Sequence, residues 1–223
     1  MQSLRSIFWS ALAIGFSGAM IPGPMLALVL SEGLSGRFLG TLGIVLGHVI
    51  LEGALVLALA LGAGRVLKRP SVGAVVGVIG GALLAYMGGS VVLAAWHNPA
   101  SLTAKAAVSL PAGPVVAGVL VSASNPAWIM WWSAVGVGYV AMSLRRGSVG
   151  LAAFYTGHTL SDWLWYGIIG ALLVSGRNIV HGPAYLWIIA ACGALLMGFG
   201  LFFIYLGLKQ VRQGFIGMRA QRV

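Results

Sequence analysis

The sequence predicts an all-α integral membrane protein with six transmembrane helices, arranged as two inverted three-helix repeats in which spans 1 and 4 are broken. Three observations support this fold class: an apolar composition, six long apolar segments and a motif that occurs twice. Of the 223 residues, 60% are hydrophobic and only 7% are charged, whereas soluble domains carry about 25% charged residues. The composition therefore excludes an ordinary soluble domain.

Six segments are each long enough to cross a bilayer, which takes about 20 helical residues. None contains lysine or arginine, and none alternates as the strands of a membrane barrel do. The first segment continues through Pro22, Gly23 and Pro24, so we expect it to be retained rather than cleaved as a signal peptide. The expected spans are residues 7–30, 39–61, 72–95, 114–140, 149–174 and 185–208.

The pattern Gly-His-x-x-x-acid occurs twice, once in span 2 with His48 and Glu52 and once in span 5 with His158 and Asp162. Residues four apart share a helix face, so each copy places an imidazole beside a carboxylate. Both carboxylates fall near the middle of their spans, where an acid costs about 2.5 to 3.5 kcal/mol and is a functional candidate. Helix packing through local His–acid pairs is the alternative.

The duplication extends beyond this motif. Pro22 in span 1 corresponds to Pro126 in span 4, and the Gly-Ala-Leu-Leu sequence at Gly81 in span 3 recurs at Gly193 in span 6. Because each half has three spans, the second half enters the membrane from the opposite side, an architecture known in transporters. We expect residues 1–106 and 107–223 to be the two repeats of one transport domain. Duplication that serves only folding is the alternative.

Prolines in the middle of two spans predict broken helices. Pro22, Gly23 and Pro24 interrupt span 1, and Asn125 and Pro126 interrupt span 4. Each proline removes a backbone donor and clashes with the preceding turn. The new helix N-termini would offer free N–H groups to an anionic part of a substrate. A pair of tolerated kinks is the alternative.

The basic residues predict the orientation. With a cytoplasmic N-terminus, ten of the 13 lysines and arginines lie on that side and three on the other, as the positive-inside rule requires. We expect a multi-pass protein of the cell inner (plasma) membrane with both termini cytoplasmic. Since topology explains the net charge of +10, the lipid bilayer is the expected partner and nucleic acid is not.

The remaining polar and aromatic residues complete the picture. Glu32, the third acid, precedes Arg37 by five residues, and a solvated salt bridge accounts for it. Several tryptophans lie near the proposed cavity, and we expect Trp132 and Trp163 to line it. No cofactor is expected. Outside the repeated motif the chain has no paired nucleophile and base, so we do not expect an enzyme.

Three of these elements together resemble a known family. The Pro-Gly-Pro of span 1, the Gly-Arg-Phe-Leu-Gly turn before span 2 and the Asn-Pro of span 4 are similar to those of the lysine exporter and homoserine/threonine resistance (LysE/RhtB) family. The resemblance covers essentially the full chain. It implies export of amino acids or similar small solutes, driven by the proton gradient or the membrane potential, commonly in a homodimer. The chain departs from many relatives at His48, where they carry an acid, and at Ala127, where they carry a basic residue.

A mechanism can be written for such a small-molecule substrate. The amides of the broken helices would receive the substrate carboxylate, because no intramembrane lysine or arginine is present. Glu52 and Asp162 would bind the ammonium group or the driving proton. His48 and His158, with an ordinary pKa near 6.5, would relay that proton.

A divalent metal-ion exporter is the competing hypothesis. His48, Glu52, His158 and Asp162 would together offer four nitrogen and oxygen ligands, which suit Zn²⁺ or Mn²⁺. Metal transport explains the proline breaks less directly than transport of an amino acid does.

Overall fold

The computed structural model describes residues 3–21, 23–67, 69–97, 112–176 and 183–220. Throughout these ranges the regular structure is helical, without strands. This confirms the all-α prediction. Four helical stretches are long and apolar enough to cross a membrane, namely Phe38–Ala60, Ser71–Leu93, Pro126–Leu144 and Ala190–Gln213. A fifth is added if a bent pair of N-terminal helices is one span.

The bent pair consists of α1 (Leu4–Ala19) and α2 (Pro24–Leu34), whose axes differ by 82°. Ser3 caps α1 by accepting the Ser6 amide N–H over 3.1 Å. Helix α2 begins with Pro24. Proline is favoured at a first helical position because an N–H there would have no acceptor within the helix. A break therefore falls inside predicted span 1. Pro22, which the sequence assigns to this break, lies outside the described residues.

The turn from α2 into the next helix contains a partly buried ion pair. Gly36 adopts a φ of 75°, which favours glycine. Arg37 donates from Nε to Glu32 Oε2 over 2.8 Å and from Nη2 to Oε1 over 2.9 Å. The predicted salt bridge is present, but Glu32 is buried rather than solvated. The pair ties the end of α2 to the start of α3.

The middle of the chain forms one long helix and two interrupted ones. Helix α3 spans Phe38–Ala60 and is followed by the short α4 (Gly64–Leu67). Helices α5 (Pro70–Val75) and α6 (Gly81–His97) are joined by a π-helical turn, η1 (Val76–Gly80). Helix α8 (Gly113–Ala123) ends just before α9 (Pro126–Trp131), which continues through η2 (Trp132–Gly136) into α10 (Val137–Leu144). Predicted span 4 is thus interrupted at Asn125.

The chain ends with two long helices, α11 (Gly147–Gly176) and α12 (Pro183–Ala220). Helix α11 covers predicted span 5 but is not among the stretches that are apolar enough to span by themselves. Polar residues such as His158, Ser161 and Asp162 lower its hydropathy, and all three are buried. Its polar face therefore points into the protein.

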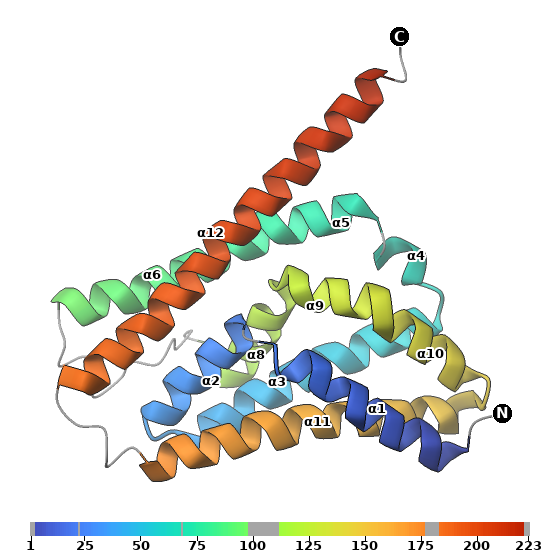
Figure 1. Ribbon diagram of the computed structural model, residues 1–223, viewed down its shortest axis with the longest axis horizontal. Coiled ribbons are helices and arrows are strands. Elements are labelled where there is room, and N and C mark those ends of the chain that lie inside the picture. The colour runs from blue at the N-terminus through green and yellow to red at the C-terminus, as the bar shows by residue number, and fades with distance from the viewer. Residues whose placement is uncertain (1–2, 22, 68, 98–111, 177–182, 221–223) are drawn as a thin grey trace.

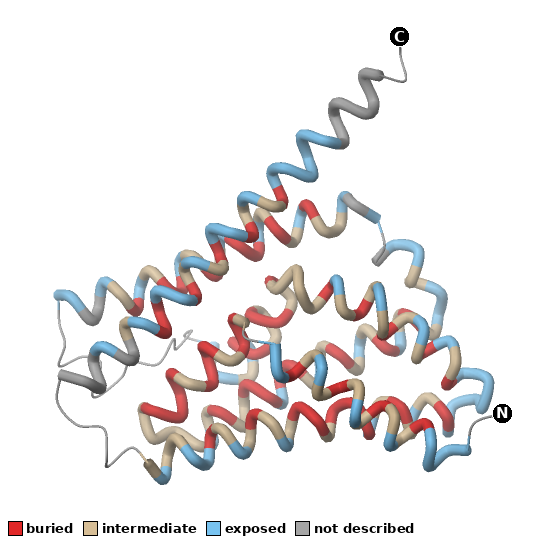
Figure 2. The backbone as a smooth tube through the Cα atoms, in the orientation of Figure 1, coloured by how far each residue is buried: buried red, intermediate tan, exposed pale blue. Residues whose placement is uncertain are grey.

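The closest helix pairs join residues that are far apart in the chain. Helix α12 packs along α6, α1 along α11, and α3 along α8 (Figure 1). Buried residues line the inner sides of α2, α3 and α11 (Figure 2). Two apolar clusters result, one formed mainly by α2, α3, α6, α8 and α12 and the other where α1, α3, η2, α10 and α11 meet.

Glycines allow these pairs to approach closely. A Cβ atom on Gly47 would overlap the Val115 carbonyl oxygen of α8, and one on Gly157 would overlap the Phe8 carbonyl oxygen of α1. Small residues at such crossings let helix backbones touch in membranes. The glycine of each motif copy thus brings the histidine and the acid beside a neighbouring helix.

Candidate functional site

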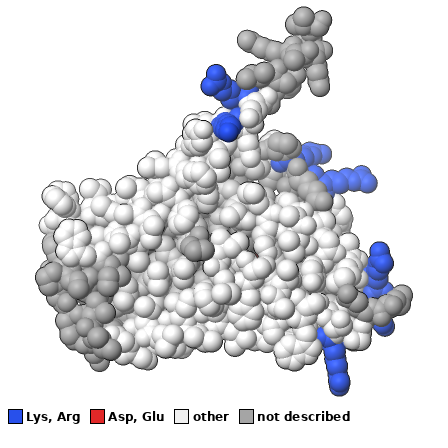
Figure 3. All heavy atoms as spheres, viewed as in Figure 1, with Lys and Arg blue, Asp and Glu red and all other residues white. Residues whose placement is uncertain are grey.

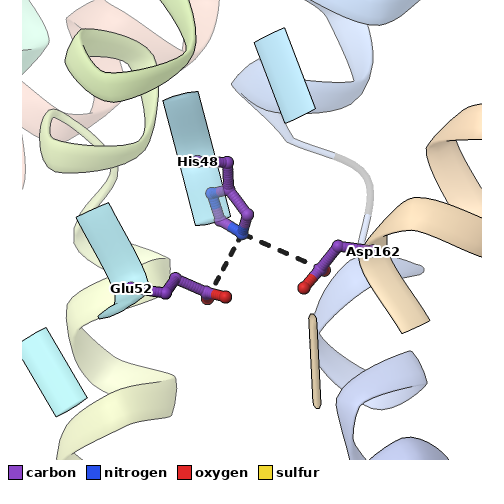
Figure 4. A group of neighbouring side chains, drawn as sticks. All are labelled: His48, Glu52 and Asp162. Carbon is purple, nitrogen blue, oxygen red and sulfur yellow. Dashed lines mark ion pairs between the residues drawn. The ribbon is translucent and has the colours of Figure 1, made fainter. Parts of the chain in front are cut away.

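The two copies of the repeated motif meet in the interior. From α3, His48 Nε2 lies 3.2 Å from Glu52 Oε1 and 3.9 Å from Asp162 Oδ1 of α11. From α11, His158 Nε2 lies 3.2 Å from Glu52 Oε1. Figure 4 shows His48, Glu52 and Asp162 pointing toward one another. All four side chains are buried, so the two motif copies build one cluster rather than two local pairs.

Two tryptophans of the broken fourth span position Glu52. Trp128 and Trp132 each donate an indole N–H to Glu52 Oε1 over 3.2 Å. An indole nitrogen can only donate, so these contacts from α9 and η2 orient the carboxylate. Trp132 is fully buried and Trp128 half-buried.

The cluster has unused hydrogen-bonding capacity. Within the described ranges, Glu52 Oε2, Asp162 Oδ2 and His158 Nδ1 are buried and have no hydrogen-bond partner. Such a group costs about 1 to 3 kcal/mol when it stays unpaired, and most buried polar groups in proteins are paired. The two carboxylates are therefore suited to bind a cation or to take up a proton.

Each histidine is positioned by different contacts. His48 Nδ1 lies 2.6 Å from Ser122 Oγ of α8. The His158 ring stacks on Trp131 with centroids 4.9 Å apart and an interplanar angle of 23°, and on Phe154 at 5.8 Å and 14°. A hydrogen bond thus orients one imidazole, while aromatic packing orients the other.

The cluster borders a cavity of about 260 Å³ that also contains both helix breaks. Gly23 and Pro24 line it at the start of α2, and Asn125 lines it at the start of α9. Trp132 is among its lining residues, as expected. Trp163 is not, because it packs against the apolar cluster formed mainly by α2, α3, α6, α8 and α12. We call this space the central cavity.

The two broken helices present different groups to the central cavity. At α9, Asn125 Oδ1 accepts the Ala127 amide N–H over 3.0 Å, so that amide is already capped. At α2, Gly23 provides no side-chain cap, and the amides of Met25 and Leu26 belong to the first turn, which has no intrahelical acceptors. A Cβ on Gly23 would lie 3.8 Å from Asn125 Nδ2. The Asn125 amide group is therefore a donor at the junction of the two breaks.

The same cluster also has the composition of a metal site. One ligand atom from each of His48, Glu52 and Asp162 lies within 4.8 Å of the others. Nitrogen and oxygen donors of this kind suit Zn²⁺ or Mn²⁺. His158 contacts Glu52 but does not belong to this group of three.

Sequence reasoning missed three contributors to the site. Ser122 binds His48, Trp128 binds Glu52, and Tyr166 lines the central cavity. Ser122 is one of three serines in span 4, and Trp128 is one of several tryptophans near the proposed cavity, so residue type alone did not distinguish either. Phe199 of α12 also lines the cavity, but no sequence pattern distinguishes it from a lipid-facing residue.

Apolar spanning helices that enclose buried carboxylates beside broken helices are typical of membrane transporters. Residues 16–207 match the model of the LysE type translocator family, and the chain belongs to this family. This confirms the family resemblance seen in the sequence. It identifies the protein as a multi-pass membrane transporter and supports the expectation that it is not an enzyme.

Two relatives are similar over nearly their whole length. "Chemotactic transduction protein ChpE" of Pseudomonas aeruginosa is 29% identical over 202 residues, which cover 87% of this chain and 96% of the relative. "Putative amino acid efflux protein YcgF" of Bacillus subtilis is 23% identical over 207 residues, which cover 92% of this chain and 99% of the relative. No solved structure matches this chain significantly.

Proposed function

We propose that this protein is a secondary active exporter of amino acids or similar small solutes across the cytoplasmic membrane, with its binding site in the central cavity. The observation that supports this most strongly is that both motif copies and both helix breaks border one space. Membership of the LysE type translocator family supports transport. The name of the Bacillus subtilis relative supports amino acids as the substrate class.

The proposed architecture has six spans in two inverted repeats, residues 1–106 and 107–223. If the repeat symmetry exchanged the two halves, the α1–α11 pair would take the place of the α8–α3 pair, and the α6–α12 pair would keep its place. These three are the most extensively packed helix pairs. Glycine contacts in α6 and α12 agree: Gly81 packs on Gly200, and Gly88 on Gly193. The sequence repeat aligns Gly81 with Gly193, so the two contacts would be equivalent.

The two ends of an amino acid would bind opposite parts of the central cavity. The carboxylates of Glu52 and Asp162 attract the positively charged ammonium group. The Met25 and Leu26 amides of α2 and the Asn125 side chain donate to the carboxylate. The described lining residues include no lysine or arginine. This division of donors and acceptors explains why both proline breaks and both acids are present.

Export would be coupled to proton antiport. The buried acids and imidazoles exchange a proton for the substrate, and the two repeats rock about the cavity. Both termini face the cytoplasm of the inner membrane. In support, Figure 3 shows lysines and arginines near the N-terminal end of the molecule and along the protruding part of α12. A homodimer, which the family resemblance implies, is part of the proposal.

Export of a divalent metal ion is the second candidate. The close approach of His48, Glu52 and Asp162 favours it. Backbone amides at the α2 N-terminus are donors and cannot ligate a cation, so the metal hypothesis leaves the proline breaks without a role. Amino-acid export accounts for more of the central cavity.

Flux through proteoliposomes tests the proposal. Labelled amino acids, Mn²⁺ and Zn²⁺ are compared with and without a pH gradient, for the wild type, Glu52→Gln and Asp162→Asn. We expect gradient-stimulated amino-acid flux that both substitutions abolish. The control is Glu32→Gln, which removes the one acid outside the cavity and should retain flux per folded molecule. Metal flux without amino-acid flux would establish the second candidate instead.

A further inference from the structure

The walls of the central cavity are aromatic as well as acidic. Of the twenty described residues that line it, seven are aromatic, against 10% of the whole chain. The rings come from three helical segments. They are Trp128, Trp131 and Trp132 around α9, Tyr166 in α11, and Phe199, Phe202 and Phe203 in α12. Such enrichment beside two carboxylates indicates a site for an organic cation.

The polar edges of the two partly accessible tryptophans are already used. Trp128 donates its indole N–H to Glu52 Oε1 over 3.2 Å, and Trp131 donates its own to Ser17 Oγ over 3.3 Å. Both rings are half-buried, as is Phe199. What these rings offer a ligand is therefore carbon surface and π electrons. Aromatic faces attract ammonium groups, and clusters of them recognise methylated ammonium groups.

The carboxylates attract an ammonium group through its charge, whether or not it is methylated. Glu52 and Asp162 both line the central cavity together with the aromatic rings. Each methyl group on nitrogen replaces an N–H that needs an acceptor by apolar surface that a ring can cover. The positive charge is unchanged, so the attraction of the carboxylates remains.

We propose that the central cavity selects small zwitterions whose ammonium group is methylated over the parent primary amines. The inference rests on the proposed function, since the same cavity is the transport site. Its volume of about 260 Å³ lies just below the range typical of drug-sized ligands, which limits the substrate to a small solute. Trp128, Trp131 and Phe199 are the residues that determine this specificity.

A methylation series at constant charge tests the inference. Glycine and its N-methyl, N,N-dimethyl and N,N,N-trimethyl derivatives are compared in binding to the full-length protein and in flux through proteoliposomes. We expect affinity to rise by about fourfold for each methyl group, the gain typical of one buried apolar carbon. Affinity that stays level or falls along the series, with amino acids still transported, would overturn this inference alone. Failure to bind or transport any amino compound would overturn the proposed function as well.

Substitution of the rings separates aromatic recognition from simple fit. Phe199→Leu and Trp131→Leu remove π surface but leave an apolar side chain, and we expect the preference for trimethylglycine over glycine to fall several-fold in each variant. The control is Trp9→Leu, since Trp9 is 62% exposed on α1 and does not line the cavity. Phe199→Leu is the smaller change and keeps the test available if Trp131→Leu does not fold. A preference that survives in both cavity variants would overturn the aromatic basis of the proposal.

Discussion

Trp132 and Glu52 are joined by a hydrogen bond of 3.2 Å from the indole Nε1 to the carboxylate Oε1, although 80 positions separate them in the chain. Trp128 makes an equivalent bond to the same oxygen. Both tryptophans follow the break in the fourth predicted span, and Glu52 belongs to the first motif copy. The broken helix therefore orients an acid that the other half of the chain provides.

Removing these donors should impair transport. Trp128→Phe and Trp132→Phe keep an aromatic ring but delete the N–H, and hydrogen bonds to charged groups contribute about 1.5 to 3 kcal/mol. We expect kcat/KM to fall by about tenfold or more in each variant, measured by flux per folded transporter. Trp165→Phe is the matched control, because Trp165 Nε1 is buried without a partner among the described residues. Equal effects of all three substitutions would contradict a specific role for Glu52 orientation.

The motif glycines should be required for helix packing. A Cβ on Gly47 or Gly157 would overlap a carbonyl oxygen of the neighbouring helix, and overpacking costs about 1 to 3 kcal/mol. We expect Gly47→Ala and Gly157→Ala to lower the midpoint of thermal unfolding in detergent. Gly167→Ala in α11 is the control, since a Cβ there meets no atom within 4 Å. It should be neutral or stabilising by up to about 1 kcal/mol. Unchanged stability of both motif variants would contradict close contact between the helix backbones at Gly47 and Gly157.

Helix α11 should cross the whole membrane despite its polar residues. Ser148 and Ser175 are exposed near its two ends, about 40 Å apart at 1.5 Å per residue, which matches a bilayer with its headgroups. Single cysteines at these positions, in a Cys192→Ala background, can be tested in intact cells with an impermeant thiol reagent. We expect Ser175→Cys to react from outside and Ser148→Cys only after permeabilisation. Labelling of both from the same side would exclude a spanning α11.

Local sequence rules predicted the helix breaks well, but they left open whether Glu52 and Asp162 are close in space. Proline removes a donor and excludes the preceding turn, so breaks near Pro24 and Pro126 follow from chemistry that needs no tertiary information. The repeated His-x-x-x-acid spacing fixed which residues share a face. The duplication suggested that the two copies lie together, and their distance became known only from the structure.

Contacts between distant helices could not be read from the sequence. Trp132 and Trp163 both lie in apolar spans near acids, yet only Trp132 lines the central cavity, because helix rotation decides which face is inward. Asn125 was expected to mark an open helix end, but its side chain caps the Ala127 amide. Glu32 is buried rather than solvated because Arg37 folds back onto it. Each outcome depends on packing that composition does not encode.

We propose that Glu52 and Asp162 act on one substrate in the central cavity, and a double-mutant cycle measures this coupling. Glu52→Gln, Asp162→Asn and the double variant are compared by kcat/KM for proteoliposome flux, since residues that act as a unit have non-additive effects. We expect each single variant to lose about 100-fold or more and the double variant to lose little beyond the worse single variant. A double-variant loss equal to the product of the two single losses, or flux that neither substitution changes, would contradict the proposal.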